Sequence, residues 1–407
     1  MGRLAKAGST LRRARDVGLS GVAQRVALRA YRQSNAASLA VQLAPEDILG
    51  AVPDELPVPE VRPERGAPLT VGFVTSPPAA GSGGHTTLFR MVEGVAARGH
   101  RCVLFLYDRH GVDLAVRASE IARHWPSLRV DVRDARSGIS GVDAVVATSW
   151  ETAHVLVRRA VGPMRRLYFI QDYEPYFYAR GSEYELAEMT YRLPIRRIAL
   201  GEMVVGEIRS HLGLASDVVP FGCDTATYRP PVPAVPRSGV VLYAKPDVAR
   251  RGYQLAGLAL ERFHSTHPEH EIHVYGTRPR DLTIPFVFHG RLTPAELNAL
   301  YGTTIAGLAM SFTNISLVAE EMLAAGTIPV VNDSPMARAD MPNPHVRWAE
   351  RTADGLAEQL RAAVDAADVA GNAAAAAASV VGRSWAPAQQ LVAQIVEDEV
   401  YGAATTP

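Results

Sequence analysis

The stretch that decides the predicted fold is Met310–Val331, MSFTNISLVAEEMLAAGTIPVV. It predicts a strand end, a tight loop, a short helix over Leu317–Ala325 that Gly326 ends, and a second strand. A strand that feeds a helix N-terminus offers an anion site, because the first backbone N–H groups of the helix are unpaired. The loop holds three residues of types that commonly begin helices, Thr313, Asn314 and Ser316. An ordinary strand–helix unit has the same pattern, so the rest of the chain must decide between these interpretations.

Length and composition indicate a globular protein. The chain has 407 residues, of which 47% are hydrophobic and 21% charged, and this length suggests about two domains. Its formal net charge is zero, which argues against a polyelectrolyte that binds nucleic acid. Cys102 and Cys223 each stand beside an apolar run, so we expect reduced core thiols and a cytoplasmic protein. No run approaches the roughly 20 apolar residues that a transmembrane helix needs, and the basic start lacks an apolar signal core.

Residues 1–50 are predicted to form a basic, helical N-terminal extension. In the first 32 residues one acid, Asp16, stands against eight basic residues: Arg3, Lys6, Arg12, Arg13, Arg15, Arg25, Arg29 and Arg32. Two interpretations stay open. The helix either contacts anionic lipid, placing the protein peripherally at the inner face of the cell membrane, or packs on the main body as a solvated helix. We expect the Pro-rich connector that follows, residues 51–68, to be extended and outside any sheet.

Strands and helices alternate over residues 69–228 and again over 239–385, which predicts an α/β protein with two Rossmann-like domains. The segment Tyr228–Ser238, YRPPVPAVPRS, is a Pro-rich break between them. Ligands of such domains bind beyond the carboxyl ends of the strands, here in a cleft between the two halves. We expect the last helix, within residues 386–407, to cross back onto the first domain.

Three segments of the first domain carry candidate binding residues. The loop Gly81–His85, GSGGH, lies between the first strand and the first helix, where glycines let a ligand approach the backbone. It lacks the glycine spacing of a dinucleotide-binding loop. Polar and aromatic side chains also follow two other strands at the same expected rim, although a loop of solvated charges would look similar. The candidates are Gly83, Gly84, His85, Trp150, Gln171, Asp172, Tyr173 and Glu174.

The second domain carries basic residues after its first strand, in the segment 243–252, YAKPDVARRG. Lys245 can meet a diphosphate as a point charge and the pair Arg250/Arg251 as planar forks, although surface basicity is the alternative. Glu321 lies one turn into the helix of the opening stretch, where a carboxylate can accept two hydroxyl donors such as those of a ribose. Glu320 is its rival and points about 100° away. The sequence has no D-x-D triplet and no His/Cys/Asp cluster with metal spacing, so we predict no metal site.

The order of these elements resembles the GT-B glycosyltransferases, and more narrowly the retaining, family 4-like enzymes. The segments 147–153 (ATSWETA), 168–175 (YFIQDYEP) and 321–326 (EMLAAG) are similar to bacterial rhamnosyltransferases that build rhamnan chains from dTDP-L-rhamnose. The resemblance spans residues 69–398. It implies a GT-B fold with two Rossmann-like domains facing across a cleft, a nucleotide-sugar donor in place of a cofactor, and a saccharide or lipid-linked glycan acceptor.

The resemblance also implies roles for the candidate residues. Lys245, with Arg250 or Arg251, would neutralise the leaving diphosphate, while Glu321 would hold the ribose. The departing phosphate would take the acceptor proton, and a dedicated base, if the enzyme has one, would be Asp172, Glu174 or His85. The implied catalytic residues are Lys245, Arg250, Glu321 and Asp172. The implied nucleotide-sugar residues are Tyr243, Lys245, Arg250, Arg251, Gly276, Thr313, Asn314, Ile315, Ser316, Leu317 and Glu321.

One position departs from the family pattern. The family signature has two glutamates eight positions apart, and counting back from Glu321 puts the first on Thr313. A threonine cannot act as a carboxylate, so this chain must bind its sugar differently there. A 6-deoxy sugar such as rhamnose needs less polar contact and fits that change.

Three other classes of protein are alternatives to a glycosyltransferase. A Rossmann oxidoreductase would need a dinucleotide fingerprint and a ribose acid, and the sequence offers neither convincingly. A GT-B sugar-nucleotide epimerase or phosphorylase would use the same cleft without a second sugar acceptor. A non-catalytic carbohydrate-binding protein would keep the fold without the basic residues after the first strand of the second domain.

Overall fold

The structure, a computed structural model, describes residues 42–79, 81–315 and 317–402. The chain divides into two compact units, residues 1–46 and 47–407, and the second unit holds both β-sheets. The predicted basic helix falls mainly on residues 1–41, which lie outside the described residues. A short 3-10 helix, η2 (Pro45–Asp47), follows that segment.

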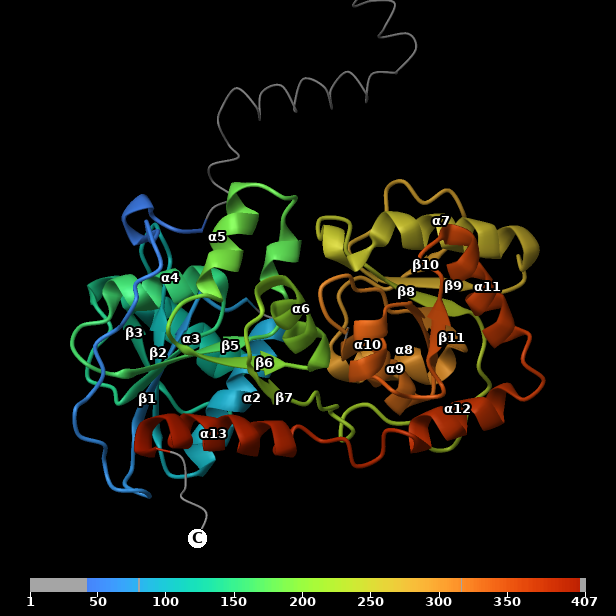
Figure 1. The fold of residues 1–407 in the computed structure, drawn as a ribbon. Helices are drawn as coiled ribbons and strands as arrows, with labels where there is room; N and C mark the ends of the chain where they lie inside the picture. Colours follow the sequence, from blue (N-terminus) through green and yellow to red (C-terminus); the bar gives the residue numbers. More distant parts are fainter. Residues whose placement is uncertain (1–41, 80, 316, 403–407) are drawn as a thin grey trace, which may run out of the picture. The chain divides into compact units, whose positions relative to one another are not determined.

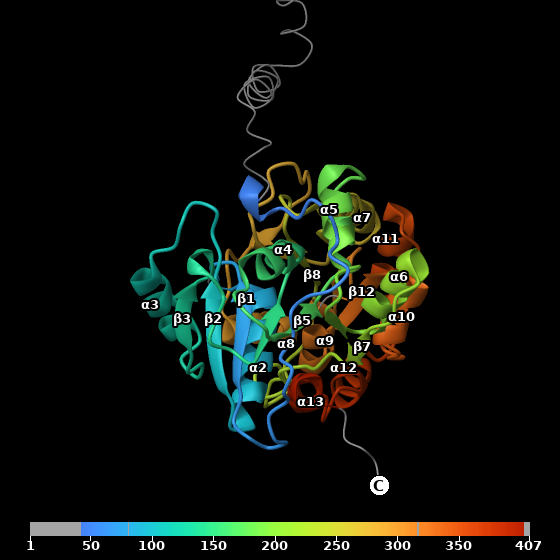
Figure 2. The ribbon, with the colours of Figure 1, turned by 60° about the vertical axis from the view of Figure 1, so that its left-hand side comes forward.

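Within the described residues, the first sheet has seven parallel strands in the order β3-β2-β1-β4-β5-β6-β7. Its strands are β1 (Thr70–Thr75), β2 (Arg101–Leu106), β3 (Asp131–Asp134), β4 (Ala144–Ala147), β5 (Arg165–Ile170), β6 (Arg196–Leu200) and β7 (Asp217–Val219). The helices are α2 (Gly83–Ala97), α3 (Leu114–His124), η3 (Ala135–Ser137), α4 (Trp150–Arg159), η4 (Glu174–Phe177), α5 (Ser182–Thr190) and α6 (Glu202–Leu212). Helices cover both faces of this sheet, with α4 on one face and α2 on the other (Figure 2).

The second sheet repeats this plan, with six described parallel strands in the order β10-β9-β8-β11-β12-β13. They are β8 (Val240–Ala244), β9 (Ile272–Gly276), β10 (Val287–Phe288), β11 (Ala306–Leu308), β12 (Ile328–Asn332) and β13 (Arg347–Ala349). The helices are η5 (Ala249–Arg251), α7 (Tyr253–Thr266), α8 (Pro294–Thr303), α9 (Leu317–Ala325), α10 (Pro335–Asp340), α11 (Ala353–Val364) and α12 (Val369–Ala378), and α13 (Ala386–Tyr401) follows (Figure 1). The predicted α/β fold with two Rossmann-like domains is confirmed.

The central strands are apolar because both faces of each sheet are covered. In the first sheet Val71 of β1 pairs with Cys102 on one side and Ala144 on the other, and all three residues are buried. The strand order reverses between β1 and β4 in the first sheet and between β8 and β11 in the second. Parallel α/β sheets bind ligands beyond the carboxyl ends of the strands at such reversal points. The fold therefore marks the loops after these four strands.

The described residues of the segment Met310–Val331 fold as predicted. Helix α9 covers Leu317–Ala325, and Gly326 follows it with a φ of +86°, a conformation that glycine adopts without strain. Two helices were not predicted, α5 and α10. The α5 sequence, SEYELAEMT, has no regular apolar stripe, and α10 has only six residues. Both therefore lack the periodic signal on which a helix prediction depends.

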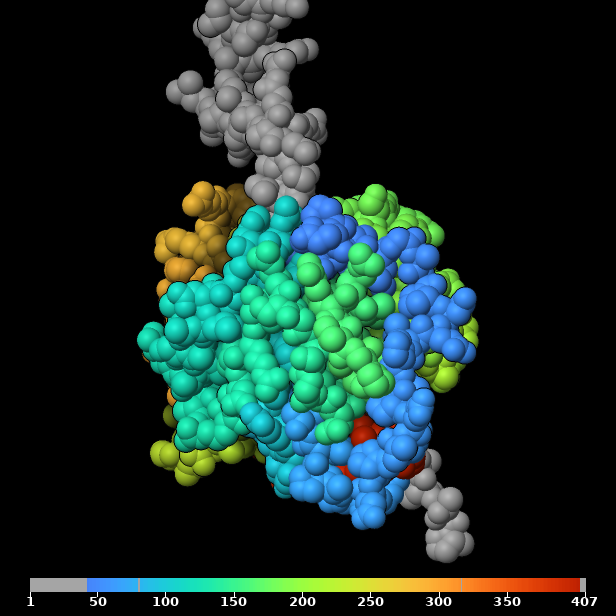
Figure 3. Space-filling model, turned by 90° about the vertical axis from the view of Figure 1, so that its left-hand side faces the viewer, coloured from blue at the N-terminus to red at the C-terminus, as the bar shows by residue number. Residues whose placement is uncertain are grey.

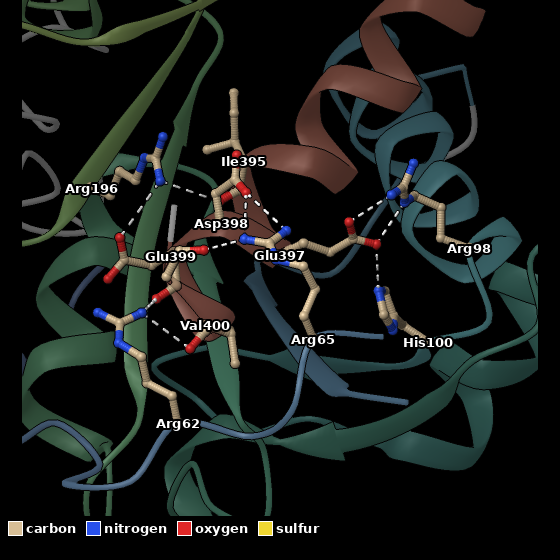
Figure 4. A network of polar contacts seen from close by, with 11 residues as sticks. Arg62, Arg65, Arg98, His100, Arg196, Ile395, Glu397, Asp398, Glu399 and Val400 are labelled. Atoms are coloured by element: carbon tan, nitrogen blue, oxygen red, sulfur yellow. Dashed lines mark hydrogen bonds and ion pairs between the residues drawn. The ribbon is translucent and has the colours of Figure 1, made fainter. Parts of the chain in front are cut away.

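Helix α13 follows the second sheet in sequence but packs against α2 of the first (Figure 1). The helices approach closely at Gly94, where an added Cβ would lie 2.6 Å from the Cβ of Gln389. Glu397 accepts two hydrogen bonds of 2.6 Å from the Arg98 guanidinium, and its Oε1 lies 3.0 Å from His100 Nε2 (Figure 4). The return of the last helix onto the first sheet therefore rests on close helix packing and a partly buried charge pair.

The connector 51–68 contains no strand, as its prolines predict. It runs over the surface beside the first sheet, with α13 visible beneath it (Figure 3). The Arg62 guanidinium donates to the carbonyl oxygens of Glu399 at 2.9 Å and Val400 at 3.2 Å, near the end of α13 (Figure 4). A cation that pairs with terminal carbonyls stabilises the negative end of a helix, so the connector helps to hold α13 in place.

Candidate functional site

The reversal point of the second sheet presents an unpaired positive charge. Lys245 directly follows β8, is exposed, and holds its ammonium 5.7 Å from the centroid of the Tyr243 ring. Tyr243 stacks on Tyr275 with centroids 4.8 Å apart and planes 6° apart, which fixes the ring beneath the ammonium. Among the described residues no carboxylate forms an ion pair with Lys245, and the whole chain has only one other lysine, Lys6. This cation is free to meet an anionic ligand.

The loop after β11 follows the strand next to β8 and is held by several hydrogen bonds. The Ser311 N–H donates to Asn332 Oδ1 at 2.9 Å, and the Asn332 amide donates back to the Ser311 carbonyl at 2.7 Å. The Arg251 guanidinium donates to Ser311 Oγ at 3.1 Å, and Phe312 N–H donates to the Arg250 carbonyl at 3.1 Å. Asn332 was not predicted, because it is remote in sequence from the loop that it supports.

A small cavity lies between β8 and the start of α9. Its lining combines apolar side chains with one guanidinium, and consists of Leu242, Tyr243, Arg251, Leu308, Ala309, Met310 and Val318. Two predicted site residues, Arg251 and Tyr243, therefore line the same cavity.

The same loop is hydrogen-bonded to the first sheet's rim. Thr313 Oγ1 donates to Asp172 Oδ1 at 2.7 Å, Asn314 Nδ2 donates to the Gln171 carbonyl at 2.8 Å, and Tyr173 N–H donates to the Thr313 carbonyl at 3.3 Å. Residues predicted for the two separate domains therefore meet. Thr313, the position that departs from the family pattern, hydrogen-bonds to a carboxylate of the other half.

Asp172 is the charged member of this junction. Burial raises the pKa of its carboxyl, while the guanidiniums of Arg251 and Arg250 and the Thr313 hydroxyl act in the opposite direction. The Arg250 guanidinium lies 4.2 Å from the centroid of Phe177, over the ring face. Burial lowers the pKa of Arg250, and its Nε has no hydrogen-bond partner. Phe177 was not among the predicted residues.

Three predicted acceptor residues lie behind the rim instead of facing a ligand. Trp150 begins α4, is 1% exposed, and donates from Nε1 to the Tyr178 hydroxyl at 3.1 Å. Tyr173 is fully buried, and its hydroxyl donates to Glu188 Oε1 at 3.0 Å. Trp150 packs on His154 and Tyr178, and Tyr173 packs on Tyr176 and Tyr191, so the number of rings in this part of the sequence reflects a local core.

Glu174 is the third of these residues and is 4% exposed. Its carboxylate accepts a hydrogen bond from the Tyr168 hydroxyl, and its N–H donates to the Tyr191 hydroxyl at 2.9 Å. Burial raises the pKa of Glu174, and the nearby carboxylate of Glu151 acts in the same direction. Both ends of Glu174 are thus bound within the first domain, and its role as an acceptor-binding residue stays a prediction.

The glycine loop of the first domain turns its histidine inward. Ser82 caps α2, and its Oγ lies 2.8 Å from Nδ1 of His85, whose Nε2 lies 3.2 Å from the Ser76 carbonyl. Burial lowers the pKa of His85, so the ring is neutral and held by its own loop. A Cβ added at Gly84 would lie 3.8 Å from Gln171 Oε1, and one at Gly83 would meet nothing within 4 Å. This opening, bounded by backbone and one amide, suits a neutral polar ligand.

The structure separates the two glutamates of α9. Glu320 is buried and pairs with Arg383, with 2.7 Å between Oε1 and the guanidinium. Glu321 faces Tyr228, whose hydroxyl hydrogen-bonds to it, and the cation of Arg90 lies nearby. Burial raises the pKa of Glu321 to about 7 in spite of both contacts. Glu320 thus has a structural partner, whereas Glu321 carries a perturbed pKa of the kind that is common at functional sites.

The remaining predicted residues divide by accessibility. Gly276 has a φ of +98°, and a Cβ there would lie 2.6 Å from the Ala244 carbonyl, so packing at the ends of β8 and β9 explains this glycine. Ile315 is buried and Leu317 begins α9, while Ser316 lies outside the described residues. Over residues 42–79, 81–315 and 317–402, no group of three His, Cys, Asp or Glu side chains could hold a metal ion. In the same ranges no helix combines the length and apolar character needed to cross a bilayer.

Two parallel sheets with this strand order and a last helix that returns to the first sheet define the GT-B fold. Solved structures share it. Sucrose-phosphate synthase of Thermosynechococcus elongatus has a TM-score of 0.61 and 13% identity, covering 80% of this chain and 98% of that chain. Anabaena Alr3699/HepE in complex with UDP-glucose has a TM-score of 0.62 and 13% identity, covering 81% and 100%.

The sequence comparisons are more specific. Residues 130–203 match the family model of the WsaF N-terminal domain, and residues 238–361 match that of the WsaF C-terminal domain. The O-antigen biosynthesis protein RfbC of Myxococcus xanthus is 29% identical over 303 residues, which are 68% of this chain and 23% of that protein. The chain therefore aligns with less than a quarter of this relative.

The comparisons support a glycosyltransferase of the GT-B fold. The fold alone does not fix the reaction. A putative UDP-N-acetylglucosamine 2-epimerase from Listeria monocytogenes also shares it, with a TM-score of 0.52 and 9% identity over 82% of this chain and 96% of that one. The chemistry has to be argued from the residues at the site.

Proposed function

We propose that this protein is a retaining, family 4-like glycosyltransferase that moves a hexosyl unit from a nucleotide sugar to a saccharide or glycoconjugate acceptor in polysaccharide biosynthesis. The donor we propose is dTDP-L-rhamnose, and the reaction needs no metal ion. The observation that carries the proposal is the free cation Lys245 after β8, together with Arg251, which donates to Ser311 in the loop after the neighbouring strand β11, at the reversal point of the second sheet. The matches to both WsaF domain models support it.

In this proposal the second domain binds the donor. Lys245, with Arg250 or Arg251, meets the diphosphate, and the N–H groups at the start of α9 add to their positive potential. Glu321 accepts a hydrogen bond from the 3′-hydroxyl of the deoxyribose of the donor. As the glycosidic bond breaks, positive charge develops on the sugar and negative charge on the diphosphate. Cations already in place stabilise that separated charge more than they stabilise the bound donor, and this difference accelerates the reaction.

The acceptor binds at the rim of the first domain, beside Gly84, Gln171 and Asp172. Of the three candidate bases, His85 and Glu174 are held by hydrogen bonds within their own domain. Asp172 is the carboxylate at the junction of the two domains, so we assign to it the contact with the acceptor: it accepts a hydrogen bond from the acceptor hydroxyl. The departing phosphate takes the proton. Thr313 donates to Asp172 where the family would have an acid, and a 6-deoxy sugar accommodates the loss of that polar contact.

A donor screen tests the proposal. The protein is incubated with dTDP-, UDP- and GDP-sugars, with and without rhamnose- or galactose-ended acceptors, and nucleotide release is measured. We expect release from dTDP-L-rhamnose to rise at least about tenfold with a suitable acceptor. If no nucleotide sugar stabilises the protein in a thermal-shift assay while NAD does, the transferase proposal is wrong.

The shared fold of the Listeria protein keeps a sugar-nucleotide epimerase as the second candidate. Such an enzyme converts one nucleotide sugar into another without a second saccharide. Nuclear magnetic resonance of the donor alone separates the two reactions. A new nucleotide sugar formed without an acceptor favours the epimerase, whereas an unchanged donor and transfer only with an acceptor favour the transferase.

We also propose that the basic N-terminal segment holds this cytoplasmic protein peripherally at the inner face of the membrane. The support is its charge, eight basic residues against Asp16 in the first 32. The full chain should float with vesicles of anionic phosphatidylglycerol and not with neutral phosphatidylcholine vesicles. Replacing Arg12, Arg13 and Arg15 by Gln should weaken flotation about tenfold or more, at roughly 1 kcal/mol per basic residue. Equal flotation of wild type and variant would contradict this proposal.

A further inference from the structure

Adjacent arginines at the junction of the two domains have different partners. The guanidinium of Arg251 donates to Ser311 Oγ, within the second domain and beside the small cavity after β8. The guanidinium of Arg250 instead covers the ring of Phe177, which belongs to η4 of the first domain, at 4.2 Å from the ring centroid. The sequence makes these residues look equivalent, but the structure turns one toward each domain.

Arg250 connects the two domains through both of its ends. Its backbone carbonyl accepts the Phe312 N–H of the loop after β11, and its side chain reaches the rim of the first domain. On the same rim Asp172 accepts the Thr313 hydroxyl and lies within electrostatic reach of Arg250. Arg250 therefore adds a further link between the proposed donor loop and the proposed acceptor rim, beside the hydrogen bonds of Thr313 and Asn314.

The contact also limits what Arg250 can bind. Phe177 covers one face of its guanidinium, and its Nε is buried, so the guanidinium edge that contains Nε is closed to a ligand from solvent. A diphosphate needs guanidinium edges that are free to form parallel N–H···O bonds. Lys245 and Arg251 lie on the second-domain side of the junction, where Lys245 is exposed. They are better placed to receive that anion.

We propose that Arg250 is a positioning residue for the acceptor and not a ligand of the diphosphate, its guanidinium fixing the Asp172–Phe177 rim against the donor loop while Lys245 and Arg251 bind the nucleotide. This inference rests on the proposed function. It replaces the expectation that Arg250 and Arg251 act interchangeably. Because a desolvated cation–π contact is worth roughly 0.5–2 kcal/mol, loss of the contact should raise the acceptor KM about 2- to 30-fold.

The test compares full-length variants R250A, R250K, F177L and R251A. Binding of dTDP is measured by titration calorimetry, and donor hydrolysis without acceptor and the acceptor KM are measured with dTDP-L-rhamnose. R250A and F177L should bind dTDP within about threefold of wild type and keep donor hydrolysis, while their acceptor KM rises. R251A should lose at least about tenfold in dTDP affinity. R250K, which keeps the charge but not the planar stack, should fall between wild type and R250A.

A matched control comes from the second domain. Arg338 also covers an aromatic ring, with its guanidinium 4.9 Å from the centroid of Trp348, and pairs with Asp333. R338A removes the same kind of contact from α10, which packs on α6 and not on the Asp172–Phe177 rim, and should change neither dTDP affinity nor acceptor KM. The double variant R250A/F177L should resemble the single variants, because both remove one contact.

Three outcomes decide the matter. The proposed division of roles between Arg250 and Arg251 is overturned if R250A and R251A lose dTDP affinity equally. It is also overturned if R250A leaves the acceptor KM and kcat unchanged. The predicted split between nucleotide affinity and acceptor KM supports it. A wild-type protein that binds no nucleoside diphosphate contradicts the proposed function instead, and so is distinguishable from a failure of this inference.

Discussion

The two sheets share one plan but differ in how they treat charge at the reversal point. In both, the strand order reverses at the same place, between the first and fourth strands of the sheet. The second sheet leaves Lys245 exposed and without an ion pair among the described residues. In the first domain, by contrast, polar side chains near the strand ends are already hydrogen-bonded within the domain. Glu174 accepts a hydrogen bond from Tyr168, and His85 is held by Ser82 and Ser76.

This difference shows that the fold sets where a ligand binds, while local pairing of charges sets which ligand binds. A diphosphate needs cations that are not already neutralised. Of the two reversal points, only that of the second sheet shows such a cation in the described part of the chain. A neutral sugar needs hydrogen-bonding groups without net charge, which the Gly84 and Gln171 opening supplies. The predictions below test this asymmetry, beginning with the largest expected effect.

Substitution of Lys245 by alanine should nearly abolish transfer. It removes the exposed cation that would stabilise the leaving diphosphate, and loss of one such preorganised group typically lowers kcat by about 10²–10³. Steady-state rates and dTDP affinity measure this effect. R262A is the control, because Arg262 forms an exposed ion pair with Asp354 far along α7. Wild-type rates in K245A would remove the asymmetry on which the account depends.

Substitution of Glu174 by alanine should act on stability and not on donor binding. It leaves the buried hydroxyl of Tyr168 without its acceptor, and an unsatisfied buried polar group costs about 1–3 kcal/mol. Urea unfolding should therefore show a lower midpoint, while dTDP affinity stays unchanged. A loss of dTDP affinity without a loss of stability would return Glu174 to the site and contradict its structural role.

Substitution of Glu321 by glutamine should weaken dTDP binding about tenfold, because a hydrogen bond from the deoxyribose hydroxyl to a neutral amide is weaker than one to a charged carboxylate. The effect should depend on pH. Burial raises the pKa of Glu321 from 4.5 to about 7, so the wild-type affinity should increase as pH rises through 7, and that of E321Q should not. Titration calorimetry between pH 6 and 8 measures both.

The same shift has an opposite consequence for the free protein. Between the ordinary pKa of 4.5 and about 7 the native state holds the proton of Glu321 more firmly than the unfolded state does. The contribution of this group to stability therefore falls as pH rises through that window. E321Q should lack this component of the pH dependence. If the free energy of unfolding depended on pH identically in wild type and E321Q, the pKa of Glu321 would not be raised in the native state.

Removal of divalent metal ions should have the smallest effect. Two basic side chains of the second domain replace a metal at the diphosphate in this account, so dialysis against EDTA should leave the transfer rate within about twofold of wild type. A loss of activity that Mg²⁺ or Mn²⁺ restores would contradict the metal-independent mechanism.

Much of the fold could be predicted from sequence because it depends on local patterns. Apolar runs, glycine stops and Pro-rich breaks indicated both α/β domains, and α9 and α13 begin and end where the pattern suggested. Helix α5 was missed because its apolar residues have no helical period, although it packs well against α4 in the folded chain. The predicted domain boundaries and site residues still await experimental tests.

The site was only partly predictable, because its decisive contacts join residues remote in sequence. Thr313 and Asp172 are 141 positions apart, and nothing near either residue announces their hydrogen bond. Phe177 and Asn332 have no motif at all, since their roles come from the partners that the fold gives them. Trp150 and Tyr173 misled for the opposite reason, because aromatic residues at a strand end fit both a sugar platform and a core.

The most direct test of the central claim uses the rarity of lysine in this chain. Reductive ¹³C-methylation keeps the lysine charge, and Lys6, Lys245 and the terminal amine give few signals, which K245R assigns. The account predicts that dTDP and dTDP-L-rhamnose shift the Lys245 signal, that free rhamnose does not, and that R251A weakens the response. A Lys245 signal that stays fixed at saturating dTDP, with binding verified by calorimetry, would show that the diphosphate lies elsewhere.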